Sequence, residues 1–220
     1  MYSIAIDGPA GAGKSTIAKM VAKELNFVYV DTGAMFRAMA LYMLDNQVDL
    51  ESKEAVEAAC GKITITISYL DGQQQVILND VNVSGQIRRE EVGNAASRIA
   101  VYPPVRTKLL ELQRALAAKE NVIMDGRDIG TAVLPNAQTK IYLTASSEER
   151  ARRRVEQLAQ NGVSADFAEV QADIIKRDEQ DMNREIAPLR QAEDAAFIDS
   201  SQMSMEEVVE AIIACYKKNQ

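Results

Sequence analysis

The segment near the N-terminus that most constrains the fold of this chain is Gly8-Pro9-Ala10-Gly11-Ala12-Gly13-Lys14-Ser15-Thr16. It matches the pattern G-x-x-x-x-G-K-[ST] and lies between the apolar run Ser3–Ile6 and the helix-like segment Lys14–Leu25. In a strand–loop–helix context, the glycines let successive backbone N–H groups turn toward an anion, and the following helix adds its positive end. The sequence therefore predicts an α/β protein with a loop that binds nucleotide phosphates, here called the phosphate loop (Gly8–Thr16).

Two residues of the phosphate loop have predicted chemical roles. Lys14 is expected to bridge the terminal phosphates of the nucleotide as a point charge, and the Ser15 hydroxyl is expected to be a Mg²⁺ ligand. Such a loop identifies the donor nucleotide but not the reaction, so a phosphotransferase and a nucleotide-hydrolysing switch or motor both remain open. The guanine-reading pattern N-K-x-D is absent, and the short chain disfavours a motor. A transferase is therefore favoured.

Short apolar runs, most of them followed by a polar residue, recur along the chain and predict five strands: Ser3–Ile6, Phe27–Val30, Val122–Met124, Ile141–Leu143 and Phe197–Ile198. The segments between them include three of helix length: Lys14–Leu25, Ala34–Leu44 and Pro103–Ala118. This alternation is typical of a five-stranded parallel sheet with helices on both faces. Ligands of such sheets bind beyond the carboxyl ends of the strands, which makes the terminal polar residues site candidates.

Residues 62–84 interrupt the alternation. Ile63–Ile67 has a period of two, Asp71-Gly72 is typical of a hairpin turn, and the apolar run Val76–Leu78 follows. We expect a small antiparallel insert. The pattern does not distinguish a flap that moves relative to the core from a rigid structural hairpin.

Composition excludes several classes of function. The 220 residues contain no histidine and carry a net charge of −7, so imidazole catalysis and bulk electrostatic binding of a nucleic-acid polymer are not expected. Cys60 and Cys215 have no paired spacing, and they predict neither a zinc site nor a disulfide. No targeting segment or membrane-spanning run is visible. We expect a cytoplasmic protein with one domain over residues 1–220.

Two further loops follow predicted strands and carry charged residues. Arg37 lies one turn into the helix that begins after Asp31, and its guanidinium is suited to an acceptor phosphate. Asp125-Gly126-Arg127-Asp128 brings an acid–arginine–acid sequence to the same edge of the sheet. Together they predict a second anion pocket, as a transferase needs.

These residues together resemble the bacterial cytidylate kinases, which belong to the nucleoside monophosphate kinases. The resemblance covers nearly the whole chain and rests on these blocks: Gly8–Thr16, Asp31–Ala34, Val83–Arg88, Asn94–Ser97, Asp125–Asp128, Ser146–Arg150, and Arg177-Asp178 through Asn183-Arg184. It implies transfer of the γ-phosphoryl of ATP to CMP, and to dCMP, by a monomer with Mg²⁺. It also implies a helical lid at about 146–165 and a monophosphate-binding region at about 33–105 that includes the insert.

The resemblance assigns three groups of substrate-binding residues. These are Thr32, Arg106 and Asp128 for cytosine; Ser97, Arg177 and Asp181 for the ribose; and Arg37, Arg127 and Arg184 for the acceptor phosphate. Phe36 stands where the family often has Tyr, so only its ring packing carries over. Arg177, Asp181 and Arg184 stand at i, i+4 and i+7, so we expect them on one helical face, although a solvated Arg–Asp pair has the same spacing.

A carboxylate at position 128 suits cytosine because it accepts from the N4 amino group. Uracil presents a carbonyl there, and an unpaired buried acceptor costs about 1–3 kcal/mol. A kinase of broader pyrimidine specificity and a nucleotide-binding regulator without transfer activity remain the alternatives.

The lid helix carries Arg150, Arg152, Arg153 and Arg154. Glu148–Arg152 and Glu149–Arg153 are expected to form i,i+4 ion pairs. Arg150 and Arg154 are also four apart and repel each other, a repulsion that an anion relieves. Arg150 and Arg154 are therefore expected to act on the transferring phosphoryl group. Lys14, Arg37 and Arg127 are expected to act on it as well. The resemblance also implies that Asp199-Ser200-Ser201, after the last strand, contributes to the adenine end of the ATP site.

Overall fold

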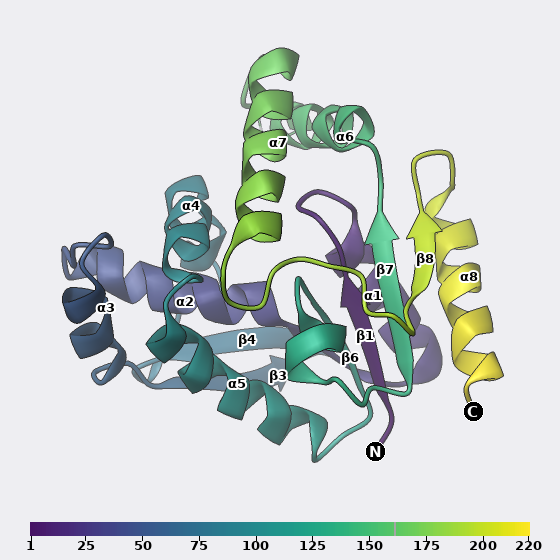
Figure 1. The fold of residues 1–220 in the computed structure, drawn as a ribbon, viewed down its shortest axis with the longest axis horizontal. Coiled ribbons are helices and arrows are strands. Elements are labelled where there is room, and N and C mark those ends of the chain that lie inside the picture. The colour runs from purple at the N-terminus through teal and green to yellow at the C-terminus, as the bar shows by residue number, and fades with distance from the viewer. Residues whose placement is uncertain (161) are drawn as a thin grey trace. The chain divides into compact units, whose positions relative to one another are not determined.

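The computed structural model describes residues 1–160 and 162–220, and the chain divides into two compact units (Figure 1). The first unit holds Met1 and residues 28–121, and the second holds residues 2–27 and 122–220. Residue 161, inside the predicted lid of about 146–165, lies outside the described residues. No helix in the described ranges is long and apolar enough to span a bilayer.

The predicted five-stranded sheet is present, with the strand order β2-β6-β1-β7-β8. Its strands are β1 (Ser3–Asp7), β2 (Val28–Asp31), β6 (Val122–Gly126), β7 (Thr139–Thr144) and β8 (Ala196–Asp199). β1 pairs in parallel with β6 on one side and β7 on the other, and Ile6 stands opposite Asp125 and Ile141. All residues of β1 and β6 are buried. Burial on both faces explains why these strands read as continuous apolar runs.

The helices of the second unit are α1 (Lys14–Leu25), α6 (Ser147–Gln160), α7 (Phe167–Asn183) and α8 (Met205–Lys218). α1 has the predicted bounds. α6 and α7 contact each other and are the green helices of Figure 1. A single π-helical turn, η2 (Ile129–Val133), follows β6. It was not expected from the sequence.

The first unit contains helices α2 (Thr32–Asp45), α3 (Lys53–Cys60), α4 (Glu90–Ile99) and α5 (Pro103–Ala117), and a short 3₁₀ turn, η1 (Gln86–Arg88). α2 buries Met35, Met39, Leu41 and Met43. A helix that is apolar around most of its circumference is the centre of a core. The hydrophobic core of this unit is therefore built around α2.

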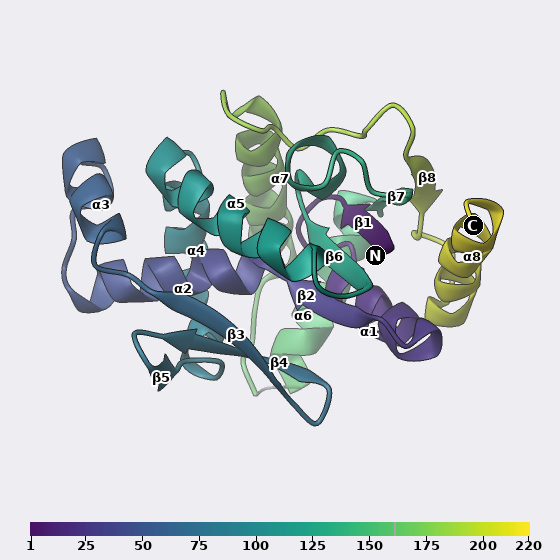
Figure 2. The ribbon, with the colours of Figure 1, turned by 90° about the horizontal axis from the view of Figure 1, so that it is seen from below.

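The predicted antiparallel insert is present as β3 (Ile65–Leu70), β4 (Gln73–Leu78) and the short β5 (Val81–Asn82) (Figure 2). Asp71 and Gly72 have φ values of 50° and 74°, as a two-residue hairpin turn of the I′ type requires. The side chain of Gln74 donates to the carbonyl of Asp31 and accepts from its N–H, at 3.1 and 2.7 Å. These bonds tie the insert to the end of β2, which favours the rigid hairpin over the flap.

Candidate active site

The phosphate loop follows β1 and leads into α1. Gly8 has φ 152°, and a Cβ atom there would lie 1.9 Å from the carbonyl oxygen of Leu143 in β7. Only glycine fits against the neighbouring strand at this position. Gly13, with φ 82°, is the residue before α1. It has no side chain to cap the helix, so the positive end of α1 faces the loop.

Lys14 is buried, and its Nζ donates a hydrogen bond to the carbonyl of Pro9 at 2.7 Å. Burial is the main reason that the pKa of Lys14 falls to about 7, and the positive charge of Arg127 lowers it further. The carboxylates of Asp125, Asp7 and Asp181 act in the opposite direction. The lysine is therefore placed where an additional negative charge would restore its full protonation.

The Ser15 hydroxyl donates to Asp125 Oδ2 at 2.8 Å. Both side chains offer oxygen atoms, which Mg²⁺ prefers, and a bound nucleotide would supply phosphate oxygens. No group of three or more candidate ligands occurs among residues 1–160 and 162–220. Mg²⁺ is usually held by one or two protein oxygens together with water and phosphate oxygens. The pair fits Mg²⁺.

Asp125 is a site residue that the sequence analysis did not assign to the metal. It ends β6, directly beside β1, where Asp125 stands opposite Ile6. The available signal was an apolar strand ending in an aspartate in a chain that also has a phosphate loop, a combination that commonly supports Mg²⁺.

The neighbouring carboxylate, Asp7, accepts from the N–H groups of Ile129 and Gly130, each at 2.7 Å. It thereby fixes the turn that follows Asp128.

Two arginines and two aspartates form a buried cluster in the second unit. Arg127 Nε donates to Asp181 Oδ2 at 2.8 Å, and Arg184 Nη2 donates to Asp128 Oδ1 at 3.1 Å. A 3.8 Å ion pair between Arg184 and Asp181 joins the two pairs. Burial alone would raise the pKa of Asp181, but the charge and hydrogen bond of Arg127 outweigh it and lower the pKa. The structure thus brings these four predicted residues together.

The prediction that Arg184 shares a helical face with Arg177 and Asp181 is wrong, because α7 ends at Asn183. Arg184 has an extended backbone, and the N–H of Leu189 turns back to the carbonyl of Asp181 at 2.8 Å. The chain reverses here through Ala187, with φ 48°, just before Pro188. This reversal, rather than helical periodicity, brings the Arg184 side chain to Asp128.

Arg150 is 5% exposed and forms a 2.6 Å ion pair with Asp178 of α7. Asp178 is thus an anion within the protein that already neutralises Arg150. The predicted catalytic role of Arg150 stays a prediction. Arg154 donates to Gln157 at 2.9 Å. Its predicted role in catalysis stays a prediction.

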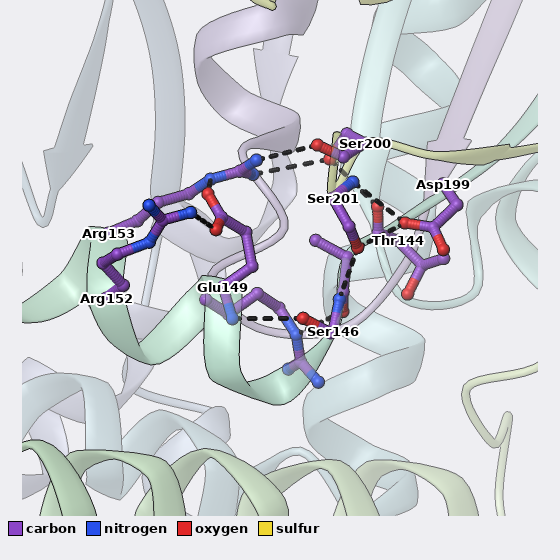
Figure 3. Close-up of polar contacts among 10 residues, drawn as sticks. Thr144, Ser146, Glu149, Arg152, Arg153, Asp199, Ser200 and Ser201 are labelled. Carbon is purple, nitrogen blue, oxygen red and sulfur yellow. Dashed lines mark hydrogen bonds and ion pairs between the residues drawn. The ribbon is translucent and has the colours of Figure 1, made fainter. Parts of the chain in front are cut away.

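Arg153 of the lid contacts Ser200, and Arg152 contacts Glu149, as Figure 3 shows. Arg153 pairs with Glu149 at 2.8 Å, as expected, and donates to the Ser200 carbonyl at 2.9 Å. Arg152 pairs with Glu149 and not with Glu148 as the sequence suggested. The Ser146 N–H donates to Ser201 Oγ at 2.9 Å. The loop after β8 is therefore bonded to the start of α6.

In the first unit, Asp31 caps α2 by accepting from the Ala34 N–H, and its other oxygen accepts from Arg37 at 2.9 Å. The guanidinium of Arg106 lies over the Phe36 ring, 5.7 Å from its centroid. Phe36 therefore retains a packing role without a hydroxyl. The two other predicted residues of this unit are Thr32, buried at the start of α2, and Ser97 in α4.

A family model described as cytidylate kinase matches residues 4–218 of the chain. The chain belongs to the cytidylate kinase family. The cytidylate kinase of Carboxydothermus hydrogenoformans is 48% identical over 96% of this chain and 95% of its own length. That of Enterococcus faecalis is 47% identical over 96% and 93%. The resemblance inferred from the sequence blocks is thus confirmed.

A solved structure of an uncharacterized protein from Eubacterium ventriosum covers 100% of both chains with a TM-score of 0.57 and 12% identity. At this identity the likeness shows the fold alone. Membership of the cytidylate kinase family confirms the predicted enzyme class, a nucleoside monophosphate kinase that uses ATP as co-substrate. It also confirms the predicted reaction, ATP-dependent phosphorylation of CMP to CDP.

Proposed function

We propose that the phosphate loop binds the triphosphate of ATP and that the Arg127–Asp181 and Arg184–Asp128 pairs take part in binding CMP. The observation that carries this proposal is the pairing of β1 with β6, in which Asp7, just before the phosphate loop, stands opposite Gly126, just before Arg127 and Asp128. Arg127 and Asp181 are close enough to Lys14 to change its pKa. A phosphoryl group held at Lys14 would therefore lie within the field of the residues proposed to hold the acceptor.

The reaction needs no general base from the protein, because the attacking phosphate oxygen of CMP is already ionised at neutral pH. Catalysis then consists of alignment and charge neutralisation. Lys14 and Arg127 neutralise the transferring and accepting phosphates, and closure of the lid excludes water. When bound at Ser15 and Asp125, Mg²⁺ supplies further charge neutralisation at the phosphate oxygens.

Each unit holds residues that are proposed to bind substrate. Those of the first unit are Thr32, Phe36, Arg37, Ser97 and Arg106, and those of the second unit are Arg127, Asp128, Arg177, Asp181 and Arg184. In the first unit, neighbouring side chains orient two of these arginines. The Phe36 ring orients Arg106, and Asp31 orients Arg37. The Asp199–Ser201 segment is proposed to contact the adenine end of ATP, since Arg153 and the start of α6 bind to it.

CMP selectivity is proposed to depend on Asp128. One of its oxygens accepts from Arg184 at 3.1 Å, and the other can accept a hydrogen bond from a substrate. Such an acceptor pairs with the N4 amino group of cytosine and opposes the O4 carbonyl of uracil. dCMP carries the same base, so it is proposed as a substrate as well.

The test is an ADP-release assay with ATP and each of CMP, dCMP, UMP and AMP. We expect the wild type to prefer CMP to UMP by about 10- to 100-fold in kcat/KM. Asp128→Asn should reduce this ratio toward one, because an amide both donates and accepts. Asp173→Asn, at an exposed position of α7, is the matched control and should keep the ratio. Equal rates on CMP and UMP by the wild type would reject the role of Asp128.

The monomeric state and cytoplasmic location expected from the sequence stay predictions. Light scattering after size-exclusion chromatography would test the first, with a mass near 24.2 kDa expected for the monomer.

A further inference from the structure

Arg150 is a buried cation whose contacts come from three separate segments. Its Nε donates to the carbonyl of Ala145, before α6, at 2.9 Å. Its Nη1 donates to the carbonyl of Ala10 in the phosphate loop at 3.0 Å and pairs with Asp178 Oδ2 in α7 at 2.6 Å. A planar guanidinium can hold several acceptors at fixed angles. The orientation of Arg150 is therefore set jointly by these three segments.

The contact with the phosphate loop also involves the stem of Arg150. A Cβ atom at Gly11 would lie 3.4 Å from Arg150 Cβ and 3.8 Å from Cγ. Gly11 adopts φ 75°, a conformation that favours glycine. The stem thus packs against the turn of the loop while the guanidinium holds the adjacent carbonyl. A shift of the loop would have to move Arg150.

Asp178 is equally constrained. It is 8% exposed, and its second oxygen, Oδ1, is buried and accepts no hydrogen bond from the residues that the structure describes. Arg150 is its ion-pair partner, and loss of that partner would leave a poorly compensated buried carboxylate, which is strongly unfavourable. Asp178 lies between Arg177 and Asp181 on α7, two residues proposed to bind CMP. If Arg150 moves, either α7 moves with it or the ion pair between Arg150 and Asp178 breaks, which is unfavourable.

We propose that Arg150 is a positioning residue that couples ATP binding to CMP binding through the contacts Ala10–Arg150–Asp178. A nucleotide that fixes the phosphate loop fixes the Ala10 carbonyl, and through Arg150 and Asp178 it fixes α7 in the position that receives CMP. The coupling is reciprocal, since each ligand changes the affinity for the other by the same factor. This inference rests on the proposed sites for ATP and CMP.

The experiment measures the Kd for CMP with and without a saturating non-hydrolysable ATP analogue and Mg²⁺. For the wild type we expect the analogue to tighten CMP binding at least about fivefold, the lower end of measured couplings. Asp178→Asn should reduce that ratio to below about twofold, because the neutral amide no longer depends on Arg150 for compensation. Its Kd for CMP alone should stay within about threefold of the wild type. A structural defect would instead weaken CMP binding in both conditions.

Arg150→Lys provides a second, independent variant. Its single ammonium can stay near Asp178, but it lacks the planar fork with which Arg150 holds Ala145 through Nε while Nη1 holds Ala10 and Asp178. It should lose the coupling while the protein stays folded, which keeps the test decisive if Asp178→Asn fails to fold. Glu179→Gln, at the next and exposed position of α7, is the matched control and should keep the wild-type ratio.

A wild-type ratio of one, or an unchanged ratio in both variants, would overturn the inference. Failure of the proposed function has a different signature, because the wild type would then bind no CMP or form no CDP.

Discussion

The charge of Lys14 depends on what binds beside it. The pKa of Lys14 is lowered to about 7, chiefly by burial. Bound phosphates would raise it again toward the usual value near 10.5. When the pH lies between these two pKa values, Lys14 is protonated in the nucleotide complex and deprotonated in the free protein. Nucleotide binding at such a pH therefore takes up a proton.

We expect uptake of about one proton when a non-hydrolysable ATP analogue binds at pH 8. The affinity for the analogue should fall as the pH rises above 7, because Lys14 of the free protein is then increasingly deprotonated and must take up a proton when the complex forms. Calorimetric titrations in buffers of different ionisation enthalpy measure the uptake directly. Lys14→Met should abolish it, and uptake that persists in this variant would assign the proton to another group.

Arg37 and Arg127 should differ in how their loss affects stability. Arg37→Ala removes an ion pair whose members are 28% and 24% exposed, which contributes at most about 1 kcal/mol. We expect kcat to fall by at least about 100-fold from the lost charge at the acceptor phosphate, with folding intact. Steady-state kinetics and thermal unfolding separate the two effects. Near-normal kcat would contradict the role proposed for Arg37.

Arg127→Ala should reduce kcat in the same way but also destabilise the protein, by about 3 kcal/mol, because Asp181 loses its closest partner. This cost is not visible in the sequence, because the Arg127–Asp181 pair joins residues 54 positions apart. Arg127→Ala combined with Asp181→Asn should recover part of the stability but not the activity. Recovery of both would show that Arg127 acts only on the fold.

At the scale of elements, replacing Gly72 or Gly93 by alanine should change the stability of the protein in opposite directions. Gly72 closes the β3–β4 hairpin with φ 74°, and nothing lies within 4 Å of an added Cβ. Gly72→Ala should destabilise the protein by about 1 kcal/mol because of backbone strain alone. Gly93, within α4, also has open space around an added Cβ but no positive φ. Gly93→Ala should stabilise by about 1 kcal/mol.

Urea unfolding of the two variants measures both effects. The same sign for both variants would contradict the backbone argument, because the added methyl group is identical.

Local patterns predicted some elements well and others poorly. The bounds of α1 and the turn at Asp71-Gly72 were correct, because glycine positions and apolar periodicity act over a few residues. The end of α7 at Asn183 and the π-helical turn η2 were missed. Both involve distant partners, since Asp7 holds η2 from 122 positions away and Arg184, the residue after α7, bonds to Asp128, 56 positions away.

At the scale of the whole molecule, ligands should raise the unfolding temperature. At 100 times its Kd, a ligand adds about 2.7 kcal/mol to the free energy of unfolding. For a chain of 220 residues this corresponds to about 5–11 °C. Differential scanning fluorimetry with the Mg²⁺ complex of a non-hydrolysable ATP analogue measures it. Lys14→Met at the same ligand concentration should show a much smaller shift, and an equal shift would place the nucleotide elsewhere.

The amino-acid sequence by itself determined the phosphate loop, the α/β class, the antiparallel insert and the family, because each depends on residue types at short, fixed spacings. Only the tertiary structure decided which charges are paired. Asp125 joins Ser15, Asp128 joins Arg184, and Asp178 neutralises Arg150. These pairs connect residues from 28 to 110 positions apart. Electrostatic energy depends on distance and burial in space, and neither can be read from separation along the chain.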